Sequence, residues 1–119
     1  NLIISVEPME SLRYLPWLSK HGWLVTNSNP YNNINDYPPV EEIISEIKKI
    51  KNHRIIEAEA IAKEAGSLKA VNMVMLGAAS HYIDLNFSSL ENSARSLFRN
   101  KGEEIIEINL KALRAGRDA

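Results

Sequence analysis

The sequence of 119 residues contains no cysteine. The chain therefore offers no thiolate to bind zinc or an iron–sulfur cluster, and it has no cysteine nucleophile. It can form no disulfide, which fits a reducing compartment, and we expect a cytoplasmic location. The longest apolar run, residues 73–79, is far shorter than the roughly 20 residues of a membrane span, so we expect no membrane association.

An excess of charge of one sign is also absent. Fourteen basic and fifteen acidic residues give a formal net charge of −1. Nucleic-acid binding needs a basic surface, so we expect no nucleic-acid partner. The sequence has no glycine-rich phosphate loop and no nucleophile elbow, and its three histidines share no metal-ligand spacing. What is present is the composition of one globular domain, which we assign to residues 1–119.

Three short apolar runs predict buried strands at residues 2–6, 23–26 and 54–57. A helix is predicted to begin at Pro8 and to end before Pro16, and the apolar stripe of residues 40–51 predicts a second helix. This alternation indicates an α/β fold with a mostly parallel sheet. Because such sheets usually have about five or six strands, we expect the chain to be the C-terminal portion of a longer domain, with further strands before Asn1.

Helices alone are predicted after residue 58: residues 58–65, residues 69–83, a helix with Ser88 and Glu91 as its capping box, and residues 103–115. Gly66 and Gly116 are predicted to end the first and the last of these helices. Six aromatic and methionine side chains are predicted to belong to the core: Trp17, Trp23, Met73, Met75, Phe87 and Phe98.

Polar side chains follow the first two predicted strands. Open parallel sheets bind ligands beyond the carboxyl ends of their strands, and there the sequence places Glu7, Asn27 and Asn29. These residues are candidates for a cofactor crevice or a subunit interface. The alternative is structural: Glu7 charges the first turn of its helix, and the asparagines shape a turn.

Three further residues are candidate contact positions. Tyr31 and Tyr37 lie on the long polar loop of residues 27–39, and tyrosine is enriched at interfaces. Asn72 is the single polar residue between Ala70 and Ala79. It either lies at an exposed helix start, ties down a neighbouring loop, or faces a ligand or partner.

Three blocks of sequence, in order along the chain, resemble the gamma-type subunits of 2-oxoacid:ferredoxin oxidoreductases. Residues 6–15 (VEPMESLRYL), with Gly22 and residues 25–27 (VTN), resemble the family's E-P-x-E-x-L-R-x-L…G…V-x-N stretch. Residues 72–78 (NMVMLGA) and 108–116 (INLKALRAG) resemble its N-M-v-x-L-G-A and N-L-x-A-f-x-x-G segments. Within the family, the sequence of these blocks is most similar to the small subunit of the indolepyruvate type.

This resemblance implies a three-layer α/β/α sandwich with partly Rossmann-like topology. The family's domain normally begins with a G-x-G-G-Q-G segment, which this sequence lacks. The resemblance also implies a non-catalytic small subunit without a cofactor of its own. Thiamine diphosphate and iron–sulfur clusters are expected in a large catalytic partner subunit, coenzyme A is the co-substrate, and ferredoxin accepts the electrons.

Two alternatives stay open at this point. The first is the gamma subunit of a pyruvate, 2-oxoglutarate or branched-chain 2-oxoacid enzyme of the same family. From a different class, a free-standing nucleotide-binding module would share the α/β plan. A dinucleotide fingerprint upstream would favour the module, and a G-x-G-G-Q-G segment would favour the oxidoreductase subunit.

Overall fold

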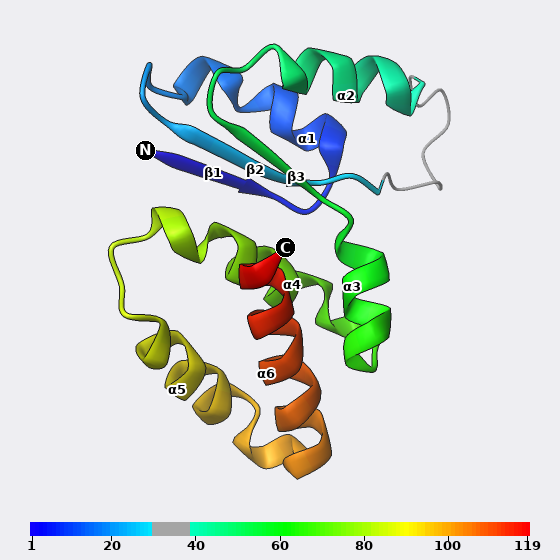
Figure 1. Ribbon diagram of the computed structural model, residues 1–119, viewed down its shortest axis with the longest axis vertical. Coiled ribbons are helices and arrows are strands. Elements are labelled where there is room, and N and C mark those ends of the chain that lie inside the picture. The colour runs from blue at the N-terminus through cyan, green and yellow to red at the C-terminus, as the bar shows by residue number, and fades with distance from the viewer. Residues whose placement is uncertain (30–38) are drawn as a thin grey trace. The chain divides into compact units, whose positions relative to one another are not determined.

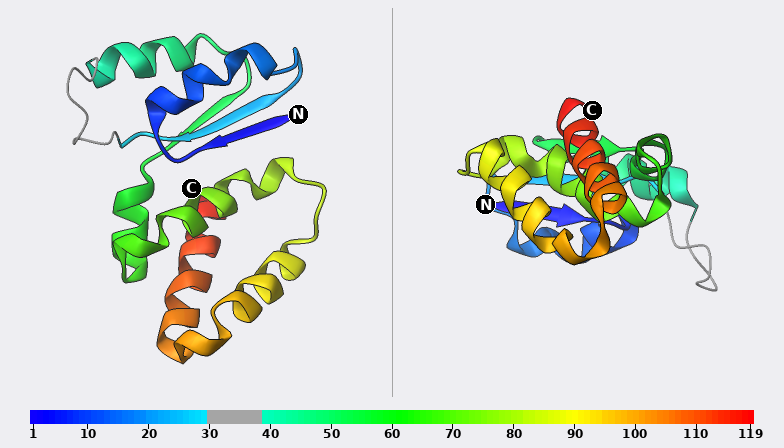
Figure 2. Two further views of the ribbon diagram at one scale, coloured as in Figure 1. Left: turned by 180° about the vertical axis from the view of Figure 1, so that it is seen from behind. Right: turned by 90° about the horizontal axis from the view of Figure 1, so that it is seen from below.

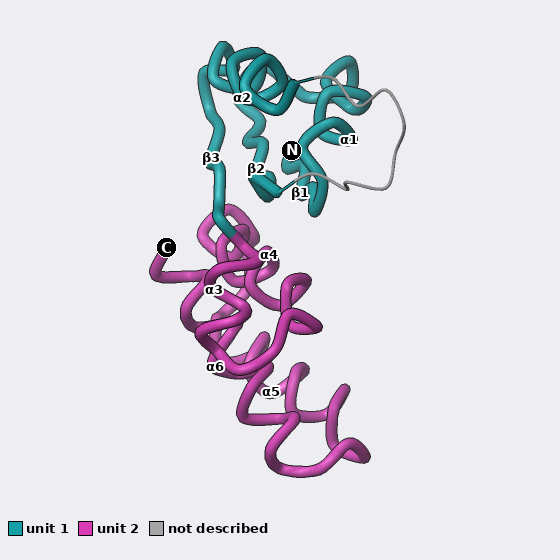
Figure 3. Tube along the Cα trace, turned by 90° about the vertical axis from the view of Figure 1, so that its right-hand side faces the viewer, with its two compact units in different colours: residues 1–57 teal, residues 58–119 magenta. Residues whose placement is uncertain are grey.

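A computed structural model describes residues 1–29 and 39–119. The described residues form two compact units, residues 1–57 (unit 1) and residues 58–119 (unit 2), which Figure 3 shows in different colours. The assignment of residues 1–119 to a single domain stays a prediction.

Unit 1 is built on a parallel three-stranded sheet. Its strands are β1 (Leu2–Ser5), β2 (Trp23–Asn27) and β3 (His53–Ile56), in the spatial order β1-β2-β3. Ser5 is the register partner of Thr26, and Thr26 is the register partner of Ile55. The predicted α/β class and the parallel pairing are therefore confirmed.

The helices of unit 1 cover one face of this sheet (Figures 1 and 2). They are α1 (Pro8–Arg13) and α2 (Val40–Lys48), and the short 3₁₀ turn η1 (Leu15–Trp17) follows α1. Leu24 on β2 packs with Ile43 and Ile47 on α2 to form the core of the unit. This packing explains the sequence pattern, because the isoleucine stripe of α2 faces the apolar strands.

The ends of α1 and α2 follow from local chemistry. Glu7 is the N-cap of α1, and Pro8 occupies the first helical position, as predicted. Pro16 lies in η1, so the predicted break before it is confirmed. Helix α2 ends at Lys48 rather than at residue 51, because Ile50 N donates to Ile47 O and closes a tighter last turn.

Trp17 is not a core residue, since 70% of its surface is exposed.

Unit 2 consists of four α-helices joined by three short 3₁₀ turns. The α-helices are α3 (Ala58–Ala65), α4 (Val71–Ala79), α5 (Phe87–Leu97) and α6 (Glu103–Asp118). The 3₁₀ turns are η2 (Leu68–Ala70), η3 (Ser80–Tyr82) and η4 (Arg99–Lys101). Helix α6 packs along α4 and also contacts α3 and α5 (Figure 1). Gly66 has a φ of 128° and follows the last residue of α3, so its predicted role as the helix end is confirmed.

Three predictions in this unit are wrong in detail. The predicted helix 69–83 is divided, because Ser67 caps η2 and Ser80 Oγ donates to Gly77 O, which ends α4. The N-cap of α5 is Asn86, whose side chain accepts from Ser88 N, so Ser88 lies within the first turn instead of capping it. Helix α6 continues past Gly116 to Asp118.

Gly77 and Gly116 allow α4 and α6 to touch through their backbones. A Cβ atom on Gly77 would overlap Leu113 O, and one on Gly116 would overlap Val74 O. Each glycine therefore removes the side chain that would hold the other helix away, as small residues do wherever helices cross closely. Gly116 therefore lies inside α6, where it allows the close contact with α4, and it does not end the helix.

Candidate functional site

Glu7 and Asn27 meet at the carboxyl ends of β1 and β2. Both residues are 2% exposed. Asn27 Nδ2 donates to Val6 O at 3.1 Å, so the asparagine joins the end of β2 to the segment that leads into α1. The sequence analysis placed both residues at this edge of the sheet, and the structure brings them together there.

The Glu7 carboxylate is held by the local fold. Its Oε2 accepts a hydrogen bond from Glu10 N at 2.9 Å, which satisfies a free donor in the first turn of α1. Ser5 Oγ accepts from Glu7 N at 3.3 Å and donates to Glu7 O at 2.5 Å. Capping supports the structural alternative for this residue. A role in a crevice or interface stays a prediction.

The other candidates of unit 1 lie on the segment that follows β2. Ser28 N donates to Ile56 O at 2.9 Å, which extends the pairing toward β3 by one residue. Asn29 comes next and is half-buried. Tyr31 and Tyr37 lie outside the described residues, so their contact role also stays a prediction.

Asn72 belongs to unit 2 and is exposed in the first turn of α4. This position agrees with the interpretation that it lies at an exposed helix start. Its neighbours Met73, Val74 and Met75 are buried. Asn72 is therefore available at the surface of unit 2 as described here.

The residues described contain no group of three or more histidine, aspartate or glutamate side chains that is placed to hold a metal ion. None of the helices in that part of the chain is both long enough and apolar enough to cross a membrane. Glu7 is the one buried ionisable side chain among them, and its carboxylate is engaged in the cap of α1. The geometry at the sheet edge thus fits a structural and contact role.

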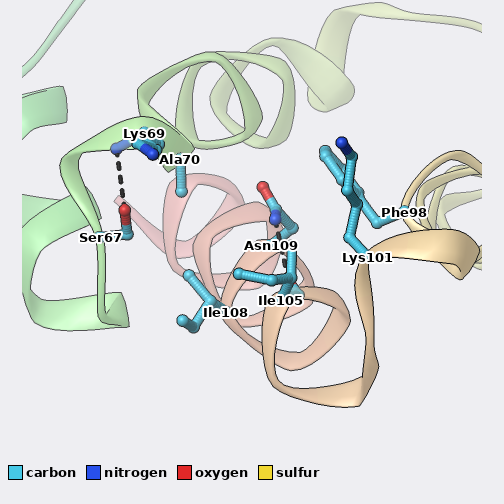
Figure 4. A pocket seen from close by; sticks show the side chains of 8 residues that line it. All are labelled: Ser67, Lys69, Ala70, Phe98, Lys101, Ile105, Ile108 and Asn109. Atoms are coloured by element: carbon cyan, nitrogen blue, oxygen red, sulfur yellow. Dashed lines mark hydrogen bonds between the residues drawn. The ribbon is translucent and has the colours of Figure 1, made fainter.

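Unit 2 has a cavity of about 290 Å³ that the sequence analysis did not identify (Figure 4). It lies between η2, the end of α5 with η4, and the first turns of α6, and it is lined by Ser67, Lys69, Ala70, Phe98, Lys101, Ile105, Ile108 and Asn109. Two of these residues, Ile108 and Asn109, belong to the sequence block 108–116, but nothing in that block indicates a cavity. The other residues lie far apart in the sequence, so only the folded helices bring them together.

The whole sequence, residues 1–119, matches the family described as pyruvate ferredoxin/flavodoxin oxidoreductase. The chain belongs to this family. The resemblance drawn from the three sequence blocks is therefore confirmed.

Curated relatives of the chain are indolepyruvate oxidoreductase subunits. The subunit IorB of Methanothermobacter thermautotrophicus is 34% identical over 98% of this chain and 62% of its own length. The subunit IorB of Archaeoglobus fulgidus is 31% identical over 98% of this chain and 61% of its own length. The chain thus spans about three-fifths of the length of the relatives that it matches.

A solved structure shares the fold. It is a 2-oxoglutarate:ferredoxin oxidoreductase from Magnetococcus marinus with 2-oxoglutarate, coenzyme A and succinyl-CoA bound. The TM-score is 0.68 and the sequence identity 22%, over 98% of this chain and 19% of the other. At this identity the likeness shows the fold alone, and it confirms the predicted fold class.

Proposed function

We propose that this chain belongs to the small, non-catalytic subunit of an indolepyruvate-type 2-oxoacid:ferredoxin oxidoreductase. The observation that carries the proposal is that its curated relatives share this subunit name and match 98% of the chain. The complex would oxidatively decarboxylate a 2-oxoacid with coenzyme A and pass the electrons to ferredoxin. Thiamine diphosphate and the iron–sulfur clusters would be bound by the large partner subunit, and the complex would be cytoplasmic.

The chemistry of the described residues supports a role in assembly. The polar side chains at the sheet edge bond within unit 1: Glu7 caps α1, and Asn27 bonds to Val6 O. A general acid or base instead needs a side chain that is free to reach the reacting group. The contribution of this chain would then be to shape and support the large subunit.

An exposed aromatic pair in unit 1 is a candidate for contact with the large subunit. Tyr14 and Trp17 are 50% and 70% exposed, and their ring centroids lie 6.1 Å apart. Aromatic side chains bury large areas at little entropic cost and dominate many interfaces. We include this pair in the proposed interface, together with residues 27–39, which contain Tyr31 and Tyr37.

The test is to co-express the full-length small subunit with the large subunit and to measure two quantities. These are the co-elution of the two chains in size exclusion and the reduction of ferredoxin by indolepyruvate with coenzyme A. A Tyr14→Ala/Trp17→Ala variant should lower the recovery of complex at least tenfold, because buried aromatic anchors often contribute about 2 kcal/mol or more each. The matched control is Lys48→Ala, an exposed residue of the same unit.

The outcomes separate the parts of the proposal. Two folded subunits that never co-elute would refute the assembly role, and an intact complex with the aromatic variant would refute only that contact. A second candidate, favoured by the family description and by the structural neighbour, is a subunit that serves a pyruvate- or 2-oxoglutarate-type enzyme. A substrate panel of indolepyruvate, pyruvate, 2-oxoglutarate and branched-chain 2-oxoacids, assayed with the same complex, decides between them.

A further inference from the structure

The lining of the unit 2 cavity combines apolar side chains with a few polar ones. Ala70, Phe98, Ile105 and Ile108 contribute apolar side chains from three separate segments (Figure 4). Ligand pockets in proteins are typically about 300–1,000 Å³, mostly apolar, and have a few placed polar groups. At about 290 Å³ this cavity has the size for a small molecule with one or two fused rings.

Asn109 provides a fixed hydrogen-bond acceptor in the cavity wall. The residue is only 7% exposed, and its Nδ2 donates to Ile105 O at 2.8 Å. A carbonyl oxygen can only accept, so the nitrogen must face Ile105 and the orientation of the amide is set. Figure 4 shows Oδ1 pointing away from Ile105 toward the space between η2 and Lys101. A ligand with a hydroxyl or N–H group could donate to this oxygen.

The charge of the cavity is positive. Its eight lining residues include Lys69 and Lys101 and no acidic residue. Neither lysine forms an ion pair within the residues that the structure describes. The acidic residues nearest in sequence on α6, Glu104 and Glu107, line a different hollow beside Gly66 and Lys111. Figure 4 shows Lys69 and Lys101 on opposite sides of the cavity, and two ammonium groups around an apolar cavity favour a negatively charged ligand.

We propose that this cavity binds a small molecule that carries a carboxylate or phosphate group on a flat apolar body. The positive charges of Lys69 and Lys101 attract the acid group, the apolar walls cover the rings, and Asn109 Oδ1 accepts a hydrogen bond from a hydroxyl on the ligand. The proposal concerns unit 2 alone. It does not depend on the proposed function, and it stands if the chain serves a different oxidoreductase.

The experiment titrates full-length protein with naphthalene probes by isothermal calorimetry and NMR. The probes are 2-naphthoate, 2-naphthyl phosphate, 6-hydroxy-2-naphthoate and, with the charge reversed, 2-naphthylmethylamine. We expect the acids to bind with a Kd of about 0.1–1 mM, the range for ligands of this size, and the amine to bind at least tenfold more weakly. Comparison of the carboxylate with the phosphate identifies the preferred acid group.

The variants assign the binding to this cavity. Lys69→Met/Lys101→Met should weaken the binding of both acids about tenfold, which corresponds to about 1.4 kcal/mol. The matched control, Lys51→Met/Lys63→Met, removes two exposed lysines that do not line the cavity and should leave the binding unchanged. In the native protein, 6-hydroxy-2-naphthoate should bind more tightly than 2-naphthoate, because its hydroxyl can donate to Asn109 Oδ1. Asn109→Leu should remove this difference in affinity while both compounds still bind.

Three results would overturn the proposal: no binding of the acids at 10 mM probe, equal binding of acid and amine, or equal loss in the lysine variant and in its control. If Asn109→Leu fails to fold, the assignment of Oδ1 is tested on the native protein by the two naphthoates alone. Equal affinity for them would then refute the role of the carboxamide.

Discussion

The crossing of α4 and α6 should not tolerate a methyl group at Gly77. In Gly77→Ala the new Cβ would overlap Leu113 O and would lie 2.9 Å from Arg117 N. Both obstacles are backbone atoms of a helix, so neither can rotate away as a side chain would. The helices must move apart, and Val74 and Leu113, which are fully buried in unit 2, lose packing contacts.

The magnitude follows from two opposing effects. Overpacking a core costs typically about 1–3 kcal/mol, and rigid backbone obstacles favour the upper end. Replacing glycine by alanine inside a helix gains about 1 kcal/mol. The net loss in the free energy of unfolding should therefore be about 2 kcal/mol. With a urea m-value of about 2 kcal/mol/M, the midpoint of unfolding should fall by about 1 M.

The assay is urea unfolding of the full-length protein followed by circular dichroism. Ser93→Ala, at an exposed position of α5, measures the gain from helix propensity without a steric clash and should raise stability slightly. Gly77→Ala/Gly116→Ala should lose less than the sum of the single variants, because helices already separated by one methyl group have room for the second. A Gly77→Ala midpoint equal to or above that of the native protein would show that the backbones do not touch.

Two asparagine substitutions test the site residues as a matched pair. Asn27→Leu removes the bond to Val6 O in a buried position and should lower the free energy of unfolding by about 1–3 kcal/mol in urea titrations. Asn72→Leu makes the same change at an exposed position of α4 and should alter stability by less than about 0.5 kcal/mol. Similar losses in both variants would contradict the assignment of Asn27 as the buried bridge and Asn72 as a surface residue.

Much of unit 1 could be predicted from the sequence because its signals are local. Apolar β-branched runs marked β1, β2 and β3, and the isoleucine stripe of α2 marked the face that packs on them. The positions of Pro8 and Pro16 predicted where α1 begins and where it is followed by η1. Parallel pairing followed from strand–helix alternation, which also brought Glu7 and Asn27 to one edge of the sheet.

The sequence by itself thus determined the order of the elements, the fold class and the family, since each depends on neighbouring residues or on local blocks. The tertiary structure decided what depends on residues far apart in the chain. Gly116 reads as a helix end until Val74 is found against it, and Trp17 reads as core although the fold leaves it exposed. The cavity between Lys69, Lys101 and Asn109 has no local signal at all, because three segments must pack before the cavity exists.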